Sequence, residues 1–126
     1  MSIRILIADD FQAVRTAVSK LINDSHEDWT VCCEASDGQA AVERAVEAKP
    51  DLVILDMRMP VRDGISAGRE IRELLPGVRI VMFTMVDSPW LEAEAAASGF
   101  QGVVQKSRCA ALIPAIRKAL SSTQPA

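Results

Sequence analysis

Short apolar runs alternate along the chain with longer segments in which apolar residues recur at helical spacing. The runs are rich in Val, Ile and Leu, a composition that is typical of strands buried in a parallel sheet. Turn and cap signals such as Asp37-Gly38, Asp63-Gly64 and Pro76-Gly77 separate the two kinds of segment. The five predicted strands span residues 3–8, 30–35, 52–55, 78–83 and 102–105.

The segments between and after these strands are predicted to be helices, because their apolar residues repeat every three or four positions. Strict alternation of strand and helix predicts a parallel sheet with helices on both faces. The expected fold class is therefore α/β, a flavodoxin-like doubly wound (βα)5 fold whose five-stranded parallel sheet has the order 2-1-3-4-5. The apolar positions of the predicted helices are Val14, Val18, Leu21 and Ile22; Ala41, Val42, Ala45 and Val46; Ile65, Ile71, Leu74 and Leu75; residues 91–97; and Leu112, Ile116 and Leu120.

The end of the chain carries two boundary signals. Pro114 falls inside the last predicted helix, 109–120, where the loss of a backbone donor should bend or break that helix. Residues 122–126 are small and polar, and they resemble a tail or the start of a linker. One domain over residues 1–121 is therefore expected, which agrees with the size of a chain of 126 residues.

Composition and charge favour an ordinary globular protein and argue against two classes of function. The chain is 49% hydrophobic and 25% charged with a formal net charge of -3, whereas nucleic-acid binding usually shows as a basic surplus. No apolar run approaches the ~20 residues that span a bilayer, and no basic start precedes an apolar stretch. We therefore expect a cytoplasmic protein that contacts neither nucleic acid nor membrane through this domain.

Cysteine and histidine indicate neither a disulfide framework nor a zinc site. The chain has three cysteines, and Cys32 and Cys33 are adjacent within a predicted strand. An odd number without a second Cys/His pair fits neither pattern, so reduced thiols packed in the core are expected. The single histidine, His26, lies in a polar segment and is expected in a solvated loop.

Polar side chains with candidate chemistry follow four of the predicted strands. In an open α/β sheet, ligands bind outside the carboxyl ends of the strands, so these side chains should share one edge. Each alone has an ordinary explanation as a helix cap, a solvated turn or a surface lysine, and only their coincidence points to a site. They are Asp9 and Asp10 after the first strand, Asp56 after the third, Thr84 after the fourth, and Lys106 with Ser107 after the fifth.

Three carboxylates at one edge imply a cation. Two unit charges ~4 Å apart interact by ~4 kcal/mol at an effective dielectric constant of ~20, so ionised Asp9, Asp10 and Asp56 would repel one another strongly. Either a cation is bound or the acids are protonated. Oxygen ligands, with water in the remaining positions, favour Mg²⁺ or Mn²⁺ over zinc.

Together these residues resemble the receiver domain of bacterial two-component response regulators. The resemblance covers nearly the whole chain, about residues 2–121, so a receiver domain is assigned to 1–121. It implies a phosphorylation-dependent signalling switch, which catalyses its own phosphoryl transfer and dephosphorylation without being a conventional enzyme. The matching residues are Asp9-Asp10, Asp56 with Met57-Arg58-Met59-Pro60, Asp63-Gly64, Thr84 and Lys106-Ser107.

The resemblance implies a role for each acid. Asp56 would be the nucleophile that accepts a phosphoryl group from a phosphohistidine on a sensor histidine kinase, forming an acyl phosphate. Asp10, Asp56 and the backbone carbonyl of Arg58 would bind Mg²⁺ (or Mn²⁺) directly, and Asp9 would act mostly through bound water. The metal would screen the acids from the incoming anion.

The resemblance also implies partners for the phosphoryl group and for the domain. Lys106 would pair with the phosphoryl oxygens, and Thr84 would turn its hydroxyl to hydrogen-bond the product. The change would spread to the fourth helix, the fifth strand and the fifth helix and control an output such as transcription. The implied partners are a sensor histidine kinase, a second copy of the chain on phosphorylation, and a C-terminal helix-turn-helix output domain that is not in this chain.

One position departs from the family pattern. Receivers usually carry Tyr or Phe three residues before the lysine, where this chain has Val103. Activation is then expected either to pass through the loop 85–90 or to be weak. In that loop Trp90 is either a packing residue at a helix start or part of a partner surface. Arg58, two residues after the nucleophile, is expected to tune the lifetime of the acyl phosphate.

Three other functions compete with the phosphorylated switch. A flavin-binding module of the same fold would need a small-residue anion cradle after the first strand, where this chain has Asp9-Asp10. A metal-dependent phosphohydrolase would need a second acid two residues after Asp56, where this chain has Arg58. A degenerate receiver would act as an adaptor that binds other proteins without phosphorylation, and it predicts no phosphate uptake.

Overall fold

The computed structural model describes residues 2–121, and its strands form one parallel sheet in the order β2-β1-β3-β4-β5. This confirms the predicted fold class and strand order. The tail predicted for 122–126 lies outside the described residues. The strands are β1 (Ile3–Ala8), β2 (Trp29–Ala35), β3 (Leu52–Leu55), β4 (Arg79–Thr84) and β5 (Gly102–Gln105). The helices are α1 (Gln12–Asp24), α2 (Gly38–Ala48), α3 (Gly64–Leu74), α4 (Pro89–Ala97) and α5 (Leu112–Ser121), with a 3₁₀ helix, η1 (Lys106–Ala111), before α5.

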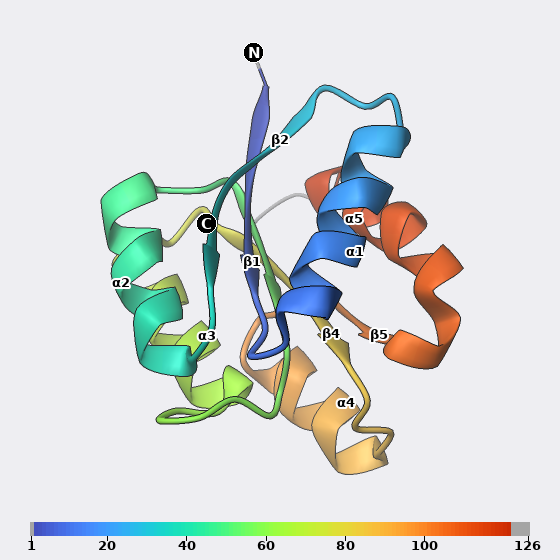
Figure 1. The fold of residues 1–126 in the computed structure, drawn as a ribbon. Helices are drawn as coiled ribbons and strands as arrows, with labels where there is room; N and C mark the ends of the chain where they lie inside the picture. Colours follow the sequence, from blue (N-terminus) through green and yellow to red (C-terminus); the bar gives the residue numbers. More distant parts are fainter. Residues whose placement is uncertain (1, 122–126) are drawn as a thin grey trace.

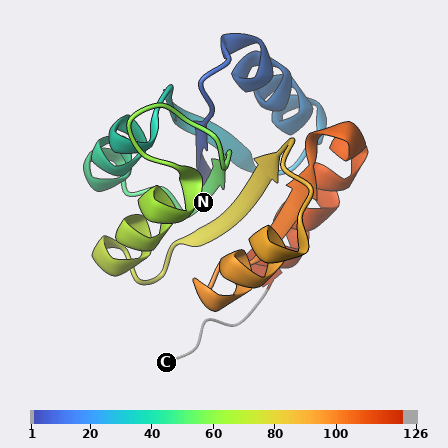
Figure 2. The same cartoon turned by 90° about the horizontal axis from the view of Figure 1, so that it is seen from below.

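Helices cover both faces of the sheet, as Figure 1 and Figure 2 show. α1 and α5 lie on one face, and α2, α3 and α4 lie on the other. Successive residues of β3 point to opposite faces: Leu52 and Ile54 join the core under α1 and α5, whereas Val53 and Leu55 join the core under the other helices. A strand buried on both faces has no polar positions, which explains the uninterrupted apolar run. Among the described residues, no helix is both long and apolar enough to cross a membrane.

Side-chain caps explain where three of the helices begin. Each cap accepts a hydrogen bond from a backbone N–H of the first turn, a group that has no partner within the helix. Two of these caps mark where the loops after β3 and β4 end and the next helices begin. The caps are Asp37, which accepts from Ala40 in α2, Asp63, which accepts from Ser66 in α3, and Ser88, which accepts from Trp90 in α4.

The last helix begins later than predicted. The segment after Lys106 is a 3₁₀ helix that contains the non-helical Arg108, and α5 starts only at Leu112. Pro114 therefore lies in the first turn of α5, where a backbone N–H would have no helical partner. The predicted break inside the helix is therefore wrong, because α5 runs without interruption from Leu112 to Ser121, whereas the predicted bend stays a prediction.

The cysteines are free, as expected, but they do not all lie in the core. Cys32 and Cys33 are half-buried, whereas Cys109 is exposed because it lies on η1 rather than on the buried face of α5. The pairing of β1 with β2 shifts after Ile5 and leaves Cys32 as the extra residue of a bulge. His26 is exposed and has a φ of 60°, which agrees with the predicted loop position.

Candidate functional site

The acids predicted from strand ends meet at one edge of the sheet. This edge lies at the bottom of Figure 1, where β1 ends. Asp9 directly follows β1 and Asp56 directly follows β3, and carboxylate oxygens of Asp9, Asp10 and Asp56 all lie within 4.8 Å of one another. Asp9 is only 2% exposed and Asp56 only 5%. The structure thus brings the three acids into one largely buried cluster.

Lys106 offsets part of the charge of this acidic cluster. It is the first residue of η1, and its Nζ lies 2.7 Å from Oδ2 of Asp9 and 3.1 Å from Oδ2 of Asp56. Burial acts to lower the pKa of Lys106, but its hydrogen bonds to Asp9 and Asp56 outweigh burial and the pKa is raised. Lys106 therefore carries its charge at neutral pH.

The acidic cluster fits a hard divalent cation. Burial raises the pKa of Asp9, and the hydrogen bonds that it accepts from Lys106 and from the backbone N–H of Phe11 only partly oppose this effect. One ammonium does not balance three carboxylates. Oδ1 of Asp10 is also buried without a hydrogen-bond partner anywhere in residues 2–121. Oxygen donors, excess negative charge and an unused buried oxygen suit Mg²⁺ or Mn²⁺, which Asp9, Asp10 and Asp56 could hold.

The remaining predicted residues lie in different surroundings. Thr84 is the last residue of β4 and is fully buried, and its Oγ1 accepts a hydrogen bond from the backbone N–H of Val86 at 3.1 Å. Its hydroxyl therefore contacts the loop that leads to α4. Arg58 is exposed, so its effect on an acyl phosphate stays a prediction. Trp90 is 56% exposed, so core packing does not account for its ring.

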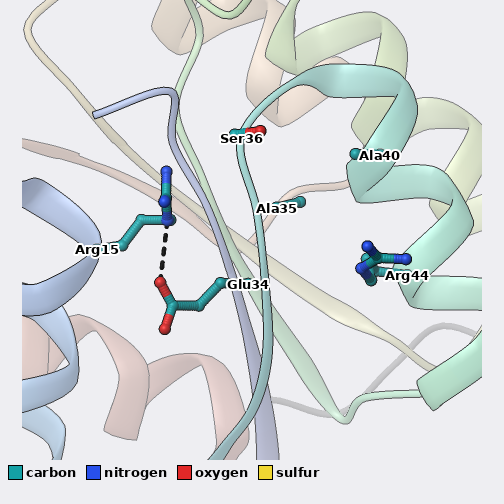
Figure 3. Close-up of a pocket in the computed structure, with 6 residues that line it drawn as sticks. All are labelled: Arg15, Glu34, Ala35, Ser36, Ala40 and Arg44. Atoms are coloured by element: carbon teal, nitrogen blue, oxygen red, sulfur yellow. Dashed lines mark hydrogen bonds and ion pairs between the residues drawn. The ribbon is translucent and has the colours of Figure 1, made fainter. Parts of the chain in front are cut away.

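Arg15 in α1 supports Asp9, and sequence reasoning missed it. Its Nη1 donates to the backbone carbonyl of Asp9 at 2.7 Å, and its Nε donates to Glu34 of β2 at 2.9 Å. Figure 3 shows Arg15 and Glu34 facing each other on one side of a polar cavity of about 140 Å³, with Arg44 of α2 on the other side. The backbone N–H of Asp9 also donates to Ala35 at the end of β2. No sequence signal indicates these contacts, because Asp9 lies before the start of α1 and Glu34 lies on another element.

The loop between Asp56 and α3 is held by contacts to two helices. Gly64 is required at its end, because a β-carbon there would lie 2.1 Å from the backbone oxygen of Asp56. The Arg62 side chain donates to Gln39 of α2 and to Ser66 and Glu70 of α3. The sequence had indicated the structural role of Gly64 but not that of Arg62, whose partners lie on separate elements.

Comparison with known proteins identifies the domain. The family model of the response regulator receiver domain matches residues 5–117. The chain belongs to this family. It is similar to the transcriptional regulatory protein LnrK of Bacillus subtilis, with 37% identity over 108 residues, 86% of this chain and 49% of the relative. It is also similar to the transcriptional regulatory protein PdtaR of Mycobacterium tuberculosis, with 38% identity over 120 residues, 94% of this chain and 57% of the relative.

Solved structures agree with this assignment of the receiver domain. A LuxR-family two-component response regulator from Aurantimonas sp. SI85-9A1 matches with a TM-score of 0.89 and 32% identity, over 99% of this chain and 91% of that chain. The receiver domain spans about half the length of the curated relatives named above. Family membership favours a receiver over a flavin-binding module or a phosphohydrolase of the same fold.

Proposed function

We propose that this receiver domain is a phosphorylation-dependent switch in which Asp56 accepts a phosphoryl group from a sensor histidine kinase. The main support is the position of Asp56: a buried carboxylate at a strand end, 3.1 Å from the ammonium of Lys106 and within 4.8 Å of two more carboxylates. Burial of an acid among acids is unfavourable for stability alone. A site that must bind a cation and a phosphoryl group accounts for the arrangement.

In the proposed reaction, a carboxylate oxygen of Asp56 attacks the phosphorus of a phosphohistidine. An O–P bond forms while the N–P bond breaks, and the leaving imidazole takes up a proton from solvent. Such transfer depends mainly on positioning and on neutralisation of charge. Mg²⁺ (or Mn²⁺), held directly by Asp10, Asp56 and the backbone carbonyl of Arg58 and mostly through bound water by Asp9, would supply positive charge against the acids and the phosphoryl oxygens.

Lys106 and Thr84 bind the transferred group in this proposal. Lys106 already contacts Oδ2 of Asp56 and exchanges this contact for one to a phosphoryl oxygen. The hydroxyl of Thr84 accepts from Val86 in the structure, and a hydroxyl also has a proton to donate. Donation of that proton to a phosphoryl oxygen would reorient the Thr84 side chain.

The proposed output is control of transcription. The relatives LnrK and PdtaR are named transcriptional regulatory proteins, and the chain corresponds to about half of each. We assign the receiver to 1–121, with 122–126 as a tail or the start of a linker to a helix-turn-helix domain. Phosphorylation would change the region of α4, β5 and α5 and promote pairing of two copies. We expect this signalling to take place in the cytoplasm.

Intact mass spectrometry tests the phosphorylation directly. The protein is incubated with acetyl phosphate and Mg²⁺ and quenched promptly, and the same is done with Asp56→Asn and with the control Asp87→Asn, which changes an exposed aspartate of another loop. We expect one phosphoryl adduct in the wild type and in Asp87→Asn, none in Asp56→Asn, and none when EDTA replaces Mg²⁺.

The same experiment separates the switch from a phosphorylation-independent adaptor. An adaptor predicts no adduct in any variant, both with acetyl phosphate and with a phosphorylated histidine kinase as donor. An adduct that persists in Asp56→Asn would instead show that another residue accepts the group. Either outcome would overturn the assignment of Asp56.

A further inference from the structure

Gln105 connects two residues of the candidate site to the loop between β4 and α4. It is the last residue of β5, it directly precedes Lys106, and it is paired with Thr84 across the sheet. Its side-chain Nε2 donates to the backbone carbonyl of Val86 at 2.8 Å. Val86 in turn donates its backbone N–H to Thr84 Oγ1 at 3.1 Å. Both backbone polar groups of Val86 are therefore held by side chains beside the site.

The two hydrogen bonds can influence each other, because both are made by the backbone of Val86. If the hydroxyl of Thr84 turns away, the N–H of Val86 loses its acceptor. That N–H lies in the peptide unit between Met85 and Val86, whereas the carbonyl of Val86 lies in the next peptide unit, and the two units share the Cα of Val86. A turn of the backbone at this Cα would also move the carbonyl of Val86 away from Gln105, whose half-buried amide would then lose the partner for its donor. Two states of the loop, with both hydrogen bonds formed or both broken, would then differ in the contacts of Thr84 and Gln105.

Val103 is the neighbour of Gln105 on the same face of β5. Residues two apart on a strand point to the same face, so Val103 and Gln105 lie side by side. Together with Glu92 of α4 and Arg108 of η1 they line a cavity of about 400 Å³. Val103 is aliphatic and has no group with which to bond the loop. Of these two neighbours on β5, only Gln105 offers a hydrogen-bond donor that reaches the loop.

We infer that Gln105 is a positioning residue that holds Val86, and through Val86 the hydroxyl of Thr84, and so couples phosphorylation of Asp56 to α4. The inference rests on the proposed function, because phosphorylation is the event that turns Thr84. It assigns to a carboxamide on β5 the coupling that an aromatic ring usually provides in receivers. The carboxamide acts on the loop, and it touches neither the acids nor the phosphoryl group.

The first arm of the test needs no phosphate. Gln105→Met keeps the length of the side chain but removes the donor, and Gln101→Met is the matched control. Gln101 is also half-buried and hydrogen-bonded, but at the opposite end of β5, to Ile80 and Gly99. We expect amide hydrogen exchange at Val86 to be about fivefold faster in Gln105→Met, which corresponds to one hydrogen bond of ~1 kcal/mol, and unchanged in Gln101→Met. Unchanged exchange in Gln105→Met would overturn the inference.

The second arm measures coupling and phosphorylation separately in a Trp29→Phe background, where the fluorescence reports Trp90 at the start of α4. We expect Gln105→Met to gain the phosphoryl adduct by mass but to lose the fluorescence change that accompanies it, whereas Gln101→Met keeps both. A full fluorescence change in phosphorylated Gln105→Met, or an equal loss in both variants, would overturn the coupling. If the Trp29→Phe protein without either glutamine substitution gains no phosphoryl adduct, both the proposed function and the coupling are refuted. The hydrogen-exchange measurement needs no phosphate, so it would still test the contact between Gln105 and Val86.

Discussion

Removal of the Asp10 charge should stabilise the protein when no divalent cation is present. Lys106 pairs with Asp9 and Asp56, so Asp10→Asn lowers the charge of the acidic cluster without breaking either ion pair. Oδ1 of Asp10 has no hydrogen-bond partner in the described part of the chain, so the substitution loses no known contact of that atom. The expected change is therefore relief of repulsion.

The structure sets the scale of this effect. At 4.8 Å and an effective dielectric constant of ~20, one pair of like unit charges repels by ~3.5 kcal/mol. Asp10 faces two such charges, and the ammonium of Lys106, which contacts both of them, offsets part of the repulsion, so ~3.5 kcal/mol is the scale before screening. Asp10 is half-buried, and solvent screening lowers this value. We expect Asp10→Asn to raise the free energy of unfolding by about 1–2 kcal/mol, a Tm increase of roughly 4–8 °C.

Urea and thermal unfolding followed by circular dichroism, in EDTA and then in Mg²⁺, provide the assay. Mg²⁺ should stabilise the wild type by mass action and should stabilise Asp10→Asn much less, because a ligand is lost. Asp87→Asn, on an exposed loop, should change the free energy of unfolding by no more than ~0.5 kcal/mol, both in EDTA and in Mg²⁺. The electrostatic reasoning is wrong if Asp10→Asn is no more stable than the wild type in EDTA. It is also wrong if Mg²⁺ stabilises Asp10→Asn as much as it stabilises the wild type.

Three further predictions concern other parts of the molecule. Val61 is β-branched, has a φ of 71° and is 78% exposed, so Val61→Asn should raise the free energy of unfolding by ~1 kcal/mol in urea titrations; an unchanged midpoint would contradict the strain. A β-carbon on Gly38 would lie 2.2 Å from a backbone oxygen of the β3–α3 loop, whereas one on Gly77 would meet nothing within 4 Å. Gly38→Ala should therefore destabilise by ~2 kcal/mol and Gly77→Ala much less, and equal losses in the same titrations would refute the clash. Burial raises the pKa of Cys33 to about 12, so at neutral pH its thiol stays protonated and iodoacetamide should alkylate the exposed Cys109 far faster, as peptide mass mapping would show. The reactivity of Cys33 should keep rising at pH values where an ordinary thiol is already fully ionised, and equal labelling of both cysteines at neutral pH would exclude the raised pKa.

The strands and the acids of the cluster were predictable because they depend on local pattern and chain direction, and the strand order followed from the flavodoxin-like fold class. A strand buried on both faces must be apolar throughout, as Leu52–Leu55 is, so an acid that follows it lies at the sheet edge. Parallel strands end at the same edge, which brings Asp9 and Asp56 together without knowledge of any side-chain contact. The start of α5 was missed because a short 3₁₀ segment differs too little in period from an α-helix.

The sequence by itself indicated that three acids and Lys106 lie at one edge of the sheet, and only the tertiary structure decided what holds them there. Arg15 meets Glu34 across 19 positions of the chain, and Gln105 meets Val86 across another 19. Each contact joins two elements whose separation depends on how helices and loops pack, and a periodicity within one element carries no information about that separation. The position of the acids can be predicted from the direction of the strands. The contacts that hold the site in place depend on the distances between elements, which only the folded structure sets.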